Sequence, residues 1–209
     1  MPQIKSLISF SVNSYLYSQI IGHLLGDGNL TLSKTSINPY FIFTQTVLRF
    51  EYLWYVFNSL SFLCYNVPRF GKSVRKGKVS YFLQVHTRSY PFLRDIFNLF
   101  YVKDMIKGNY VKRVPIEIFF LLNPISLAYW AMDDGGKTTG GSGFYLHTKG
   151  FTFKEAYLLA GIMHYKFGLF CTVQNHDNRP VIYIRSKSKS QFITLVYPYF
   201  HHTLLYKLK

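Results

Sequence analysis

The sequence predicts an α+β fold made of two pseudo-symmetric halves, each with the element order αββαββα. An apolar stretch that ends in aspartate and glycine occurs twice, at residues 20–28 and 127–135. Segments in which polar and apolar residues alternate follow each copy, and such alternation is typical of half-buried strands. The chain of 209 residues is long enough for two halves of roughly 100 residues with a substantial core.

The two copies of the apolar stretch align without a gap, and Asp27 then matches Asp134, an offset of 107 residues. Each copy is apolar nearly all round, which suits a helix buried on more than one side. The first copy has no acid at the position matching Asp133, so only the last carboxylate is common to both. A carboxylate at the C-terminal end of a helix lies near the negative end of the helix dipole. A cation should compensate it, and a divalent metal ion is the natural candidate.

The other elements of the first half follow from the spacing of apolar residues. Ser14 is a suitable cap for a helix over residues 15–25. Beyond it we expect strands at 29–33 and 41–46, a helix at 49–62, strands at 67–70 and 79–87 joined by a basic turn at 71–78, and a helix at 90–100.

The second half repeats this order after its own apolar helix. We expect strands near 143–148, 171–174 and 181–186, a hairpin tip at 175–180, a helix at 154–167 and a last helix at 192–199. The chain is therefore divided into an N-terminal half (1–103), a connecting segment (104–123) and a C-terminal half (124–209).

Charge and composition restrict the kind of partner. The 24 Lys and Arg residues against 9 Asp and Glu residues give a net charge of +15, which favours a polyanion. An aromatic content of 19% excludes a disordered basic tail. The most apolar window, 47–65, contains Arg49 and Glu51, so no membrane-spanning helix is expected. The two cysteines lie in apolar runs, which favours free thiols in a reducing, intracellular setting.

The two apolar copies, each followed by strands, resemble the signature of the single-chain, two-motif LAGLIDADG homing endonucleases. The second copy with its surroundings, at 127–137, 151–153 and 206–208, is especially similar to a mitochondrial intron-encoded member. The resemblance implies that the motif helices pack side by side along the pseudo-twofold axis. It also implies that two four-stranded antiparallel sheets form a saddle on DNA. Small residues would permit the close helix approach, namely Gly22, Gly26, Ala128 and Ala131.

The resemblance also implies a catalytic centre. Asp27, Asp134 and Gly26 would hold Mg²⁺ or Mn²⁺ ions, while Ca²⁺ could bind without supporting cleavage. Asp133 is assigned to the metal set or, as the favoured alternative, to a capping role. Lys112 and Lys207 would stabilise charge on the phosphate, and Arg113 competes with Lys112 for that place. Gln45 would lie near the metal site, and its counterpart is Thr148 or Lys149.

DNA contacts are expected on one face of the strands and at the hairpin tips. Arg and Lys can pair with guanine, and Asn and Gln with adenine, in the major groove. Most lysines of the basic turn and of 187–189 are expected to meet phosphates instead. The candidates are Asn29, Thr31, Ser33, Lys34, Lys72, Arg75, Lys76, Lys78, Gln84, His86, Arg88, Lys137, His147, Lys149, Gln174, Asn178, Arg185 and Lys187.

The expected function is that of a monomeric, metal-dependent endonuclease that cuts both strands of a long asymmetric DNA site across the minor groove, leaving 3′ overhangs. Its role would be intron homing in an organelle, with the mitochondrion favoured over the chloroplast. Two alternatives stay open: an intron maturase that binds RNA, and a DNA-binding protein with a dead catalytic centre.

Overall fold

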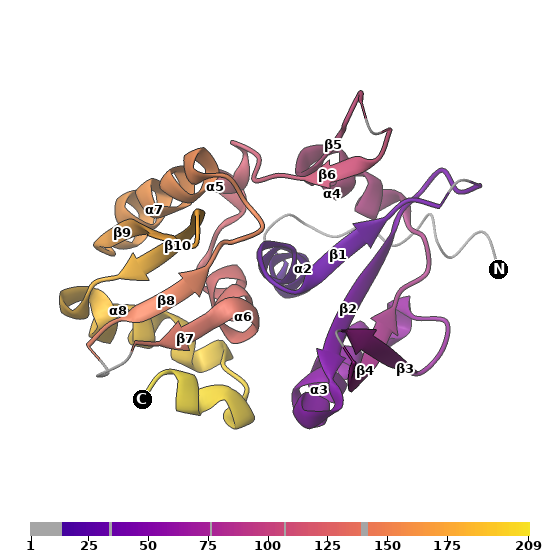
Figure 1. Cartoon of the computed structure of the whole chain (residues 1–209), viewed down its shortest axis with the longest axis horizontal. Coiled ribbons are helices and arrows are strands. Elements are labelled where there is room, and N and C mark those ends of the chain that lie inside the picture. Colours follow the sequence, from indigo (N-terminus) through magenta and orange to yellow (C-terminus); the bar gives the residue numbers. More distant parts are fainter. Residues whose placement is uncertain (1–13, 34, 76, 107, 139–141) are drawn as a thin grey trace.

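The computed structural model describes residues 14–33, 35–75, 77–106, 108–138 and 142–209 (Figure 1). Its first half has the predicted order αββαββα. The elements are α2 (Tyr15–Leu25), β1 (Gly28–Thr31), β2 (Tyr40–Thr46), α3 (Phe50–Leu60), β3 (Arg69–Arg75), β4 (Lys78–His86) and α4 (Pro91–Phe100).

The second half has the same order. It consists of α6 (Pro124–Asp134), β7 (Gly135–Lys137), β8 (Phe144–His147), α7 (Phe153–Phe167), β9 (Cys171–His176), β10 (Arg179–Ile184) and α8 (Ser186–Val196). A short hairpin, β5 (Tyr101–Lys103) with β6 (Tyr110–Lys112), and helix α5 (Ile118–Leu121) lie between the halves. Short 3₁₀ segments are η1 (Val47–Arg49), η2 (Ser61–Leu63), η3 (Tyr197–Tyr199) and η4 (His202–Lys207).

The two large sheets have equivalent topology. Their strand orders are β1-β2-β4-β3 and β7-β8-β10-β9, and every pairing is antiparallel. The registers also correspond, because Gly28 pairs with Phe43 in one half and Gly135 with Leu146 in the other. Figure 1 shows the halves side by side with α2 and α6 between them. The expected fold of two pseudo-symmetric α+β halves is confirmed.

Helices α2 and α6 approach closely where α2 carries glycine. A Cβ atom on Gly22 would lie 2.5 Å from the backbone oxygen of Ser126, and one on Gly26 would lie 2.5 Å from Cβ of Asp133. Ala128 and Ala131 are completely buried. Any larger residue at Gly22 or Gly26 would therefore separate the helices and displace the aspartates that follow them.

Both motif helices begin at a side-chain cap. Ser14 Oγ accepts a hydrogen bond from the backbone N–H of Tyr17 at 3.2 Å, as expected. Asn123 and Ser126 form a reciprocal capping box at the start of α6. These caps satisfy N–H groups that a helix leaves without an intrahelical partner.

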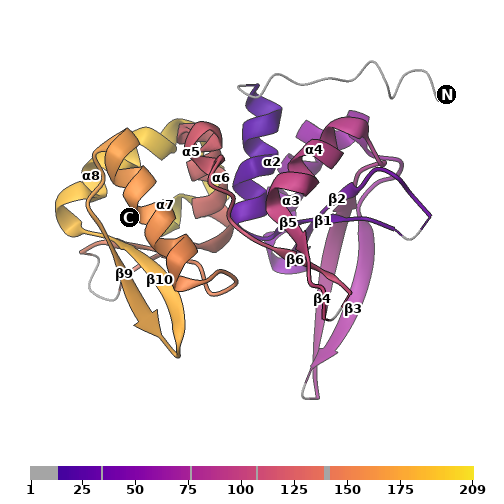
Figure 2. The same ribbon diagram turned by 90° about the horizontal axis from the view of Figure 1, so that it is seen from above.

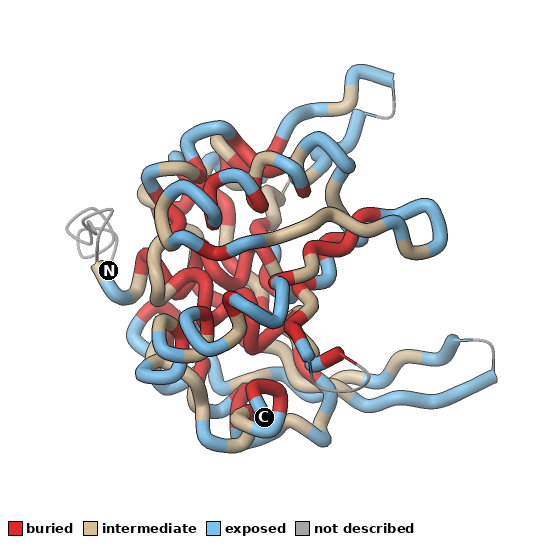
Figure 3. Tube along the Cα trace, turned by 90° about the vertical axis from the view of Figure 1, so that its left-hand side faces the viewer, coloured by how far each residue is buried: buried red, intermediate tan, exposed pale blue. Residues whose placement is uncertain are grey.

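Alternation along the strands leaves one face of each sheet open. In β2, Phe41 and Phe43 are completely buried under the helices, whereas Ile42 and Thr44 are only partly covered. Leu146 and Ile182 are the buried counterparts in the second sheet. The hairpins project on the side away from the helices (Figure 2), and their ends are exposed (Figure 3). Nucleic-acid contacts were expected on strand faces of this kind.

The hairpins are longer than expected. The segment 71–78, expected as a basic turn, is mostly strand, because β3 continues to Arg75 and β4 begins at Lys78. Gly77, at φ 75°, supplies the positive dihedral of the tight turn. The second hairpin turns at Asp177 and Asn178, with φ of 55° and 59°, the type of geometry that matches strand twist.

Other boundaries also differ from the expectation. Helix α8 begins at Ser186 rather than at 192, since its polar first turns carry no apolar periodicity. Strand β7 and the β5–β6 hairpin were not expected, because strands of three residues are too short for an alternation signal. No helix among the described residues is long and apolar enough to cross a membrane. Cys64 and Cys171 are free, as expected.

Candidate active site and nucleic-acid interface

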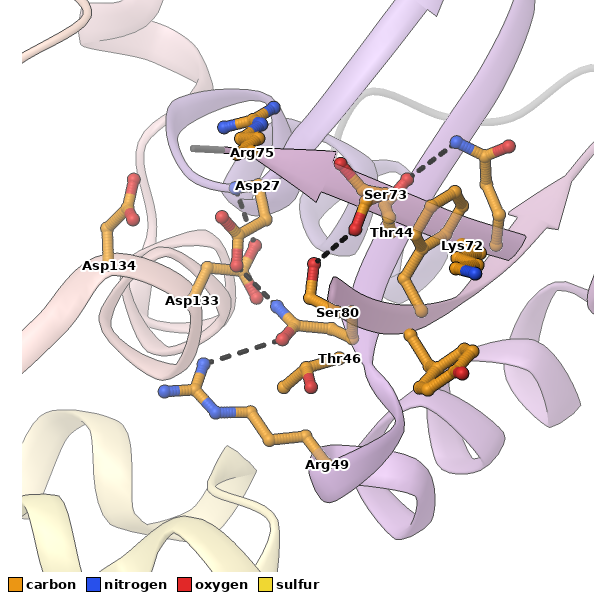
Figure 4. A pocket seen from close by; sticks show the side chains of 14 residues that line it. Asp27, Thr44, Thr46, Arg49, Lys72, Ser73, Arg75, Ser80, Asp133 and Asp134 are labelled. Carbon is orange, nitrogen blue, oxygen red and sulfur yellow. Dashed lines mark hydrogen bonds between the residues drawn. The ribbon is translucent and has the colours of Figure 1, made fainter. Parts of the chain in front are cut away.

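Asp27 and Asp134 lie at the C-terminal ends of the two motif helices. Asp27 stands in the turn between α2 and β1, and Asp134 is the last residue of α6. Both line one open groove of about 890 Å³, with Asp133 and Arg49 beside them (Figure 4). The pseudo-symmetry therefore brings the two expected catalytic acids to the same cavity.

The aspartates carry strongly perturbed acidities. Burial, and next the charge of Asp133, raise the pKa of Asp27 to about 6. Burial, and next the charges of Asp27 and Asp133, raise the pKa of Asp134 to about 7. Ionising this cluster without a counterion is costly, and a divalent cation would remove the cost.

Asp133 is engaged by the opposite half. Its buried carboxylate accepts hydrogen bonds from His23 Nδ1 at 2.8 Å, from the Tyr52 hydroxyl at 2.8 Å and from the backbone N–H of Asp27 at 3.2 Å. The helix alignment places Gly26 opposite it, and the absent side chain makes room for the carboxylate. This arrangement favours the capping role over metal binding.

Gln45 belongs to the site, together with a residue that the sequence analysis missed. Gln45 Nε2 donates a hydrogen bond to Oδ2 of Asp27, and Arg49 Nη1 donates to Gln45 Oε1 at 3.5 Å. Arg49 immediately precedes α3, four residues after Gln45. Its position close behind Gln45, at the end of a strand and the start of a helix, was the signal that could have identified it.

The strand registers settle the counterpart of Gln45. Counting two residues beyond the matched pair Phe43 and Leu146 leads from Gln45 to Thr148, not to Lys149. Thr148 is buried, and its hydroxyl donates to the carbonyl oxygen of Pro180 at 2.8 Å. The second half therefore offers Asp134 no amide equivalent to Gln45.

Two lysines lie at the ends of the motif helices. Lys112 Nζ donates to the carbonyl oxygens of Leu24 and Gly28, at 3.1 and 2.7 Å. Lys207 Nζ donates to those of Met132 and Asp133, at 2.6 and 3.3 Å. Helix C-termini attract cations in this way.

Burial lowers the pKa of each of these ammonium groups to about 8, although the aspartates oppose the shift. Arg113 instead donates to the carbonyl oxygen of Leu99 and is exposed. Lys112, not Arg113, therefore faces the aspartate pair.

The residues present fit a divalent cation only in part. Asp27 and Asp134 supply carboxylate oxygens, the preferred ligands of Mg²⁺. Among the described residues, no group of three or more His, Cys, Asp and Glu could enclose a metal ion. Mg²⁺ commonly keeps water and binds phosphate oxygens beside one or two carboxylates. The donor set therefore suits an ion completed by water and a nucleic-acid phosphate.

The open face of the first sheet carries a polar row. Gln84 pairs with Thr44 across the β2–β4 ladder, and its Nε2 donates to Thr44 Oγ1 at 2.8 Å. His86 Nε2 lies 2.6 Å from Gln84 Oε1. Arg69, which the sequence analysis missed, pairs with Gln84 on the other side. Asn29 begins the row on β1, where its Oδ1 accepts a hydrogen bond from the Tyr101 hydroxyl at 2.6 Å.

Other first-half candidates are more scattered. Arg75 and Lys78 pair at the hairpin end on the same face as Gln84, whereas Lys72 pairs with Tyr81 on the opposite face. The Arg88 guanidinium lies 4.9 Å from the centroid of the Tyr65 ring, beyond the end of β4. Thr31 and Ser33 are partly exposed, and Lys34 and Lys76 lie outside the described residues.

The second sheet presents mostly aromatic and imidazole rings on its open face. Tyr145 was not among the predicted contacts. Its ring centroid lies 5.6 Å from that of His176 and 5.2 Å from that of Tyr183. His147 and Gln174 share this face, because both pair with Val181.

The remaining second-half candidates lie at or beyond the ends of the strands of the second sheet. Lys149 Nζ lies 3.7 Å from Asp177 of the hairpin turn, next to Asn178. Lys137 is exposed at the end of β7. Arg185 precedes α8, and Lys187 lies on that helix with its ammonium 3.3 Å from the Phe170 ring centroid. Lys187 is therefore off the open strand face where direct base contacts were expected.

Comparisons with known proteins agree with this geometry. A model of the LAGLIDADG DNA endonuclease family matches residues 17–192. Cytochrome b mRNA maturase bI2 of Saccharomyces cerevisiae is 33% identical over 208 residues, which cover 94% of this chain and 48% of the maturase. Intron-encoded endonuclease ai4 of Dictyostelium discoideum is 34% identical over 156 residues, which cover 73% of this chain and 95% of that protein.

Among solved structures, the homing endonuclease I-WcaI bound to its DNA recognition sequence superposes with a TM-score of 0.88 at 23% identity. The match covers 100% of this chain and 92% of I-WcaI. The chain spans about half the length of the yeast maturase. The family match runs through both motif helices and both large sheets. This chain belongs to the LAGLIDADG DNA endonuclease family.

Proposed function

We propose that the chain is a site-specific endonuclease that uses Mg²⁺ or Mn²⁺ to hydrolyse both strands of a long, asymmetric DNA duplex. The observation that carries the proposal is the pair Asp27 and Asp134, which lie at the ends of two packed helices and whose pKa values burial raises to about 6 and about 7. The pair faces a groove that continues onto the polar strands of the first sheet. Intron homing in an organelle, with the mitochondrion favoured, is the corresponding biological role.

The proposal assigns a chemical role to each side chain at the centre. Asp27 and Asp134 hold the ions, which would supply a Lewis acid and a water of lowered pKa. Gln45 orients the carboxylate of Asp27 and can accept a hydrogen bond from a water molecule. Lys112 and Lys207 place positive charge where the phosphate gains negative charge during hydrolysis. The protein acts as a monomer, because one chain supplies both aspartates.

The test is cleavage of a randomised duplex library by the purified protein, with Mg²⁺ and with a chelator. The proposal expects recovery of one long site with Mg²⁺ and none with the chelator. The double variant Asp27→Asn/Asp134→Asn should lose cleavage and keep duplex binding, since the amides preserve shape and remove charge. Loss of binding together with cleavage would show that the acids are structural and would overturn the mechanism.

A second candidate is intron RNA binding that assists splicing. The similarity to a cytochrome b mRNA maturase over 94% of this chain favours it, as does the net charge of +15. Tight binding to structured intron RNA, with no cleavage of any duplex in the library, would place this function first. Binding to neither nucleic acid would exclude both candidates.

A further inference from the structure

The β5–β6 hairpin, residues 101–112, leaves the body of the protein on the side of the β3–β4 and β9–β10 hairpins (Figure 2). It spans the boundary between the N-terminal half and the connecting segment and belongs to neither large sheet. Its ladder is short, with Tyr101 opposite Lys112 and Lys103 opposite Tyr110. We call residues 101–112 the connector hairpin.

The base of the connector hairpin is fixed beside the aspartate pair. The Tyr101 hydroxyl accepts a hydrogen bond from the backbone N–H of Leu30 at 2.8 Å and donates to Asn29 at 2.6 Å. Lys112 reaches from β6 to the carbonyl oxygen of Gly28, directly after Asp27. The hairpin is thus attached both to the edge strand β1 of the first sheet and to the end of α2.

Hydrogen bonds join the described residues on either side of position 107 at the tip. The backbone N–H of Asp104 donates to the carbonyl oxygen of Asn109, and that of Gly108 donates to Asp104, each at 2.8 Å. The N–H of Ile106 donates to the Asp104 carboxylate at 2.9 Å. Gly108 has a φ of 70°, which a residue with a Cβ atom adopts only with strain.

The described part of the tip carries two exposed apolar side chains. Met105 is 88% exposed and Ile106 is 96% exposed. A single exposed apolar residue is ordinary. Two adjacent ones, at the end of an anchored hairpin that points toward the proposed DNA side, are suited to a contact that forms only on binding.

We propose that the Met105–Ile106 tip packs against sugars and base edges in the DNA minor groove, beside the cleavage centre on the side of the first half. The inference rests on the proposed function. Architectural DNA-binding proteins use apolar side chains, including methionine and isoleucine, as minor-groove wedges.

The length of the hairpin limits the distance between Lys112 and the proposed contact. Met105 and Ile106 lie four and five residues beyond Tyr101, which pairs with Lys112, so the tip is at most about 13–17 Å from Lys112 at the rise of a strand. Since bases along a strand are spaced by about 3.4 Å, the contact should lie within about five base pairs of the phosphate near Lys112. Lys103, on the same hairpin and exposed, is placed for the adjoining phosphate.

The experiment uses the full chain, Ca²⁺ to prevent cleavage, and the duplex recovered from the library. A photoreactive benzoylphenylalanine is placed at position 106, with position 120 as the matched control. Phe120 is also apolar and 72% exposed, but it lies on α5, away from the hairpin tips (Figure 2). Crosslinking from 106, mapped to within about five base pairs of the cut, with none from 120, supports the proposal.

Affinity provides a second measurement. The double variant Met105→Ser/Ile106→Ser should bind the duplex about tenfold more weakly, whereas Phe120→Ser should bind as the wild type does. Normal cleavage and binding without a crosslink from 106 would overturn the tip contact and leave the endonuclease intact. A crosslink from 106 only to RNA, or to a second copy of the chain, would also overturn it. Absence of both cleavage and duplex binding would instead reject the proposed function.

Discussion

The carboxylate of Asp133, in the second half, accepts a hydrogen bond from the backbone N–H of Asp27, in the first half, at 3.2 Å. His23 and Tyr52 donate to the same carboxylate, so all three donors come from the opposite half. This contact joins the two halves directly beneath the proposed catalytic pair. It fixes the turn that presents Asp27 while leaving the Asp27 carboxylate free to face the groove.

Replacing Asp133 by alanine should therefore destabilise the whole chain. The substitution leaves His23, Tyr52 and the Asp27 N–H without their acceptor. Because buried donors without a hydrogen-bond partner are costly, the free energy of unfolding should fall by about 2–4 kcal/mol in total. Urea denaturation measures the loss. Tyr52→Phe removes only one of the donors and should cost about 1 kcal/mol. Equal stability of Asp133→Ala and wild type would contradict the capping role.

Removing one charge of the catalytic pair should stabilise the metal-free protein. The pKa values of Asp27 and Asp134 are raised in the folded state, so ionising them opposes folding above about pH 7. Asp134→Asn should raise the free energy of unfolding at pH 8 by about 1 kcal/mol after allowance for solvent screening, or Tm by about 2–4 °C.

The gain should begin to shrink below about pH 7, where Asp134 of the folded wild-type protein takes up its proton, and should vanish near the unfolded pKa of about 4. Thermal unfolding at pH 8 and pH 5, in chelator, makes the comparison. A gain of the same size at both pH values would show that charge repulsion is not its cause.

Metal affinity should rise with pH through the range in which the pair ionises. Below the raised pKa values of about 6 and about 7, a metal ion must displace protons from Asp27 and Asp134. At limiting Mg²⁺, cleavage should therefore increase from pH 6 to pH 8, and excess Mg²⁺ should move the midpoint to lower pH. Cleavage rates across a pH and Mg²⁺ grid test this. A midpoint that stays fixed as Mg²⁺ increases would exclude competition between protons and metal.

Lys112 should act in the chemical step more than in binding. Its ammonium lies beside the aspartates, and Lys112→Met should lower the cleavage rate about a hundredfold or more, with duplex affinity in Ca²⁺ little changed. Arg113→Met is the matched control, because Arg113 is the next residue but donates to Leu99 on the outside. Single-turnover cleavage and binding separate the two effects. Similar losses in both variants would assign Lys112 to general electrostatic attraction.

The sequence was sufficient for the repeated parts of this molecule. The two apolar copies predict the paired helices, because each ends in aspartate and glycine, Asp27-Gly28 and Asp134-Gly135, at one offset of 107 residues. The repeat does not identify Arg49, because Arg49 lies outside both copies. Its part in the site depends on a side-chain hydrogen bond to Gln45, four residues earlier. The β5–β6 hairpin was missed because its strands have three residues, fewer than an alternating pattern requires. Likewise, Tyr145 and Tyr183 look like core residues until the register places them on the open face.

The two DNA strands should be cut at unequal rates once Gln45 is removed. Gln45 donates a hydrogen bond to the Asp27 carboxylate. The hydroxyl of its counterpart Thr148 donates instead to the carbonyl oxygen of Pro180, not to Asp134. Gln45→Ala should therefore misplace only the Asp27 carboxylate. The strand cut at that side should slow by on the order of tenfold to a hundredfold, and nicked duplex should accumulate. Thr148→Val is the matched control and should lower stability without changing the ratio of the two rates. The ratio is measured by labelling each strand in a single-turnover reaction, and an unchanged ratio in Gln45→Ala would mean that Gln45 does not position Asp27 for one strand alone.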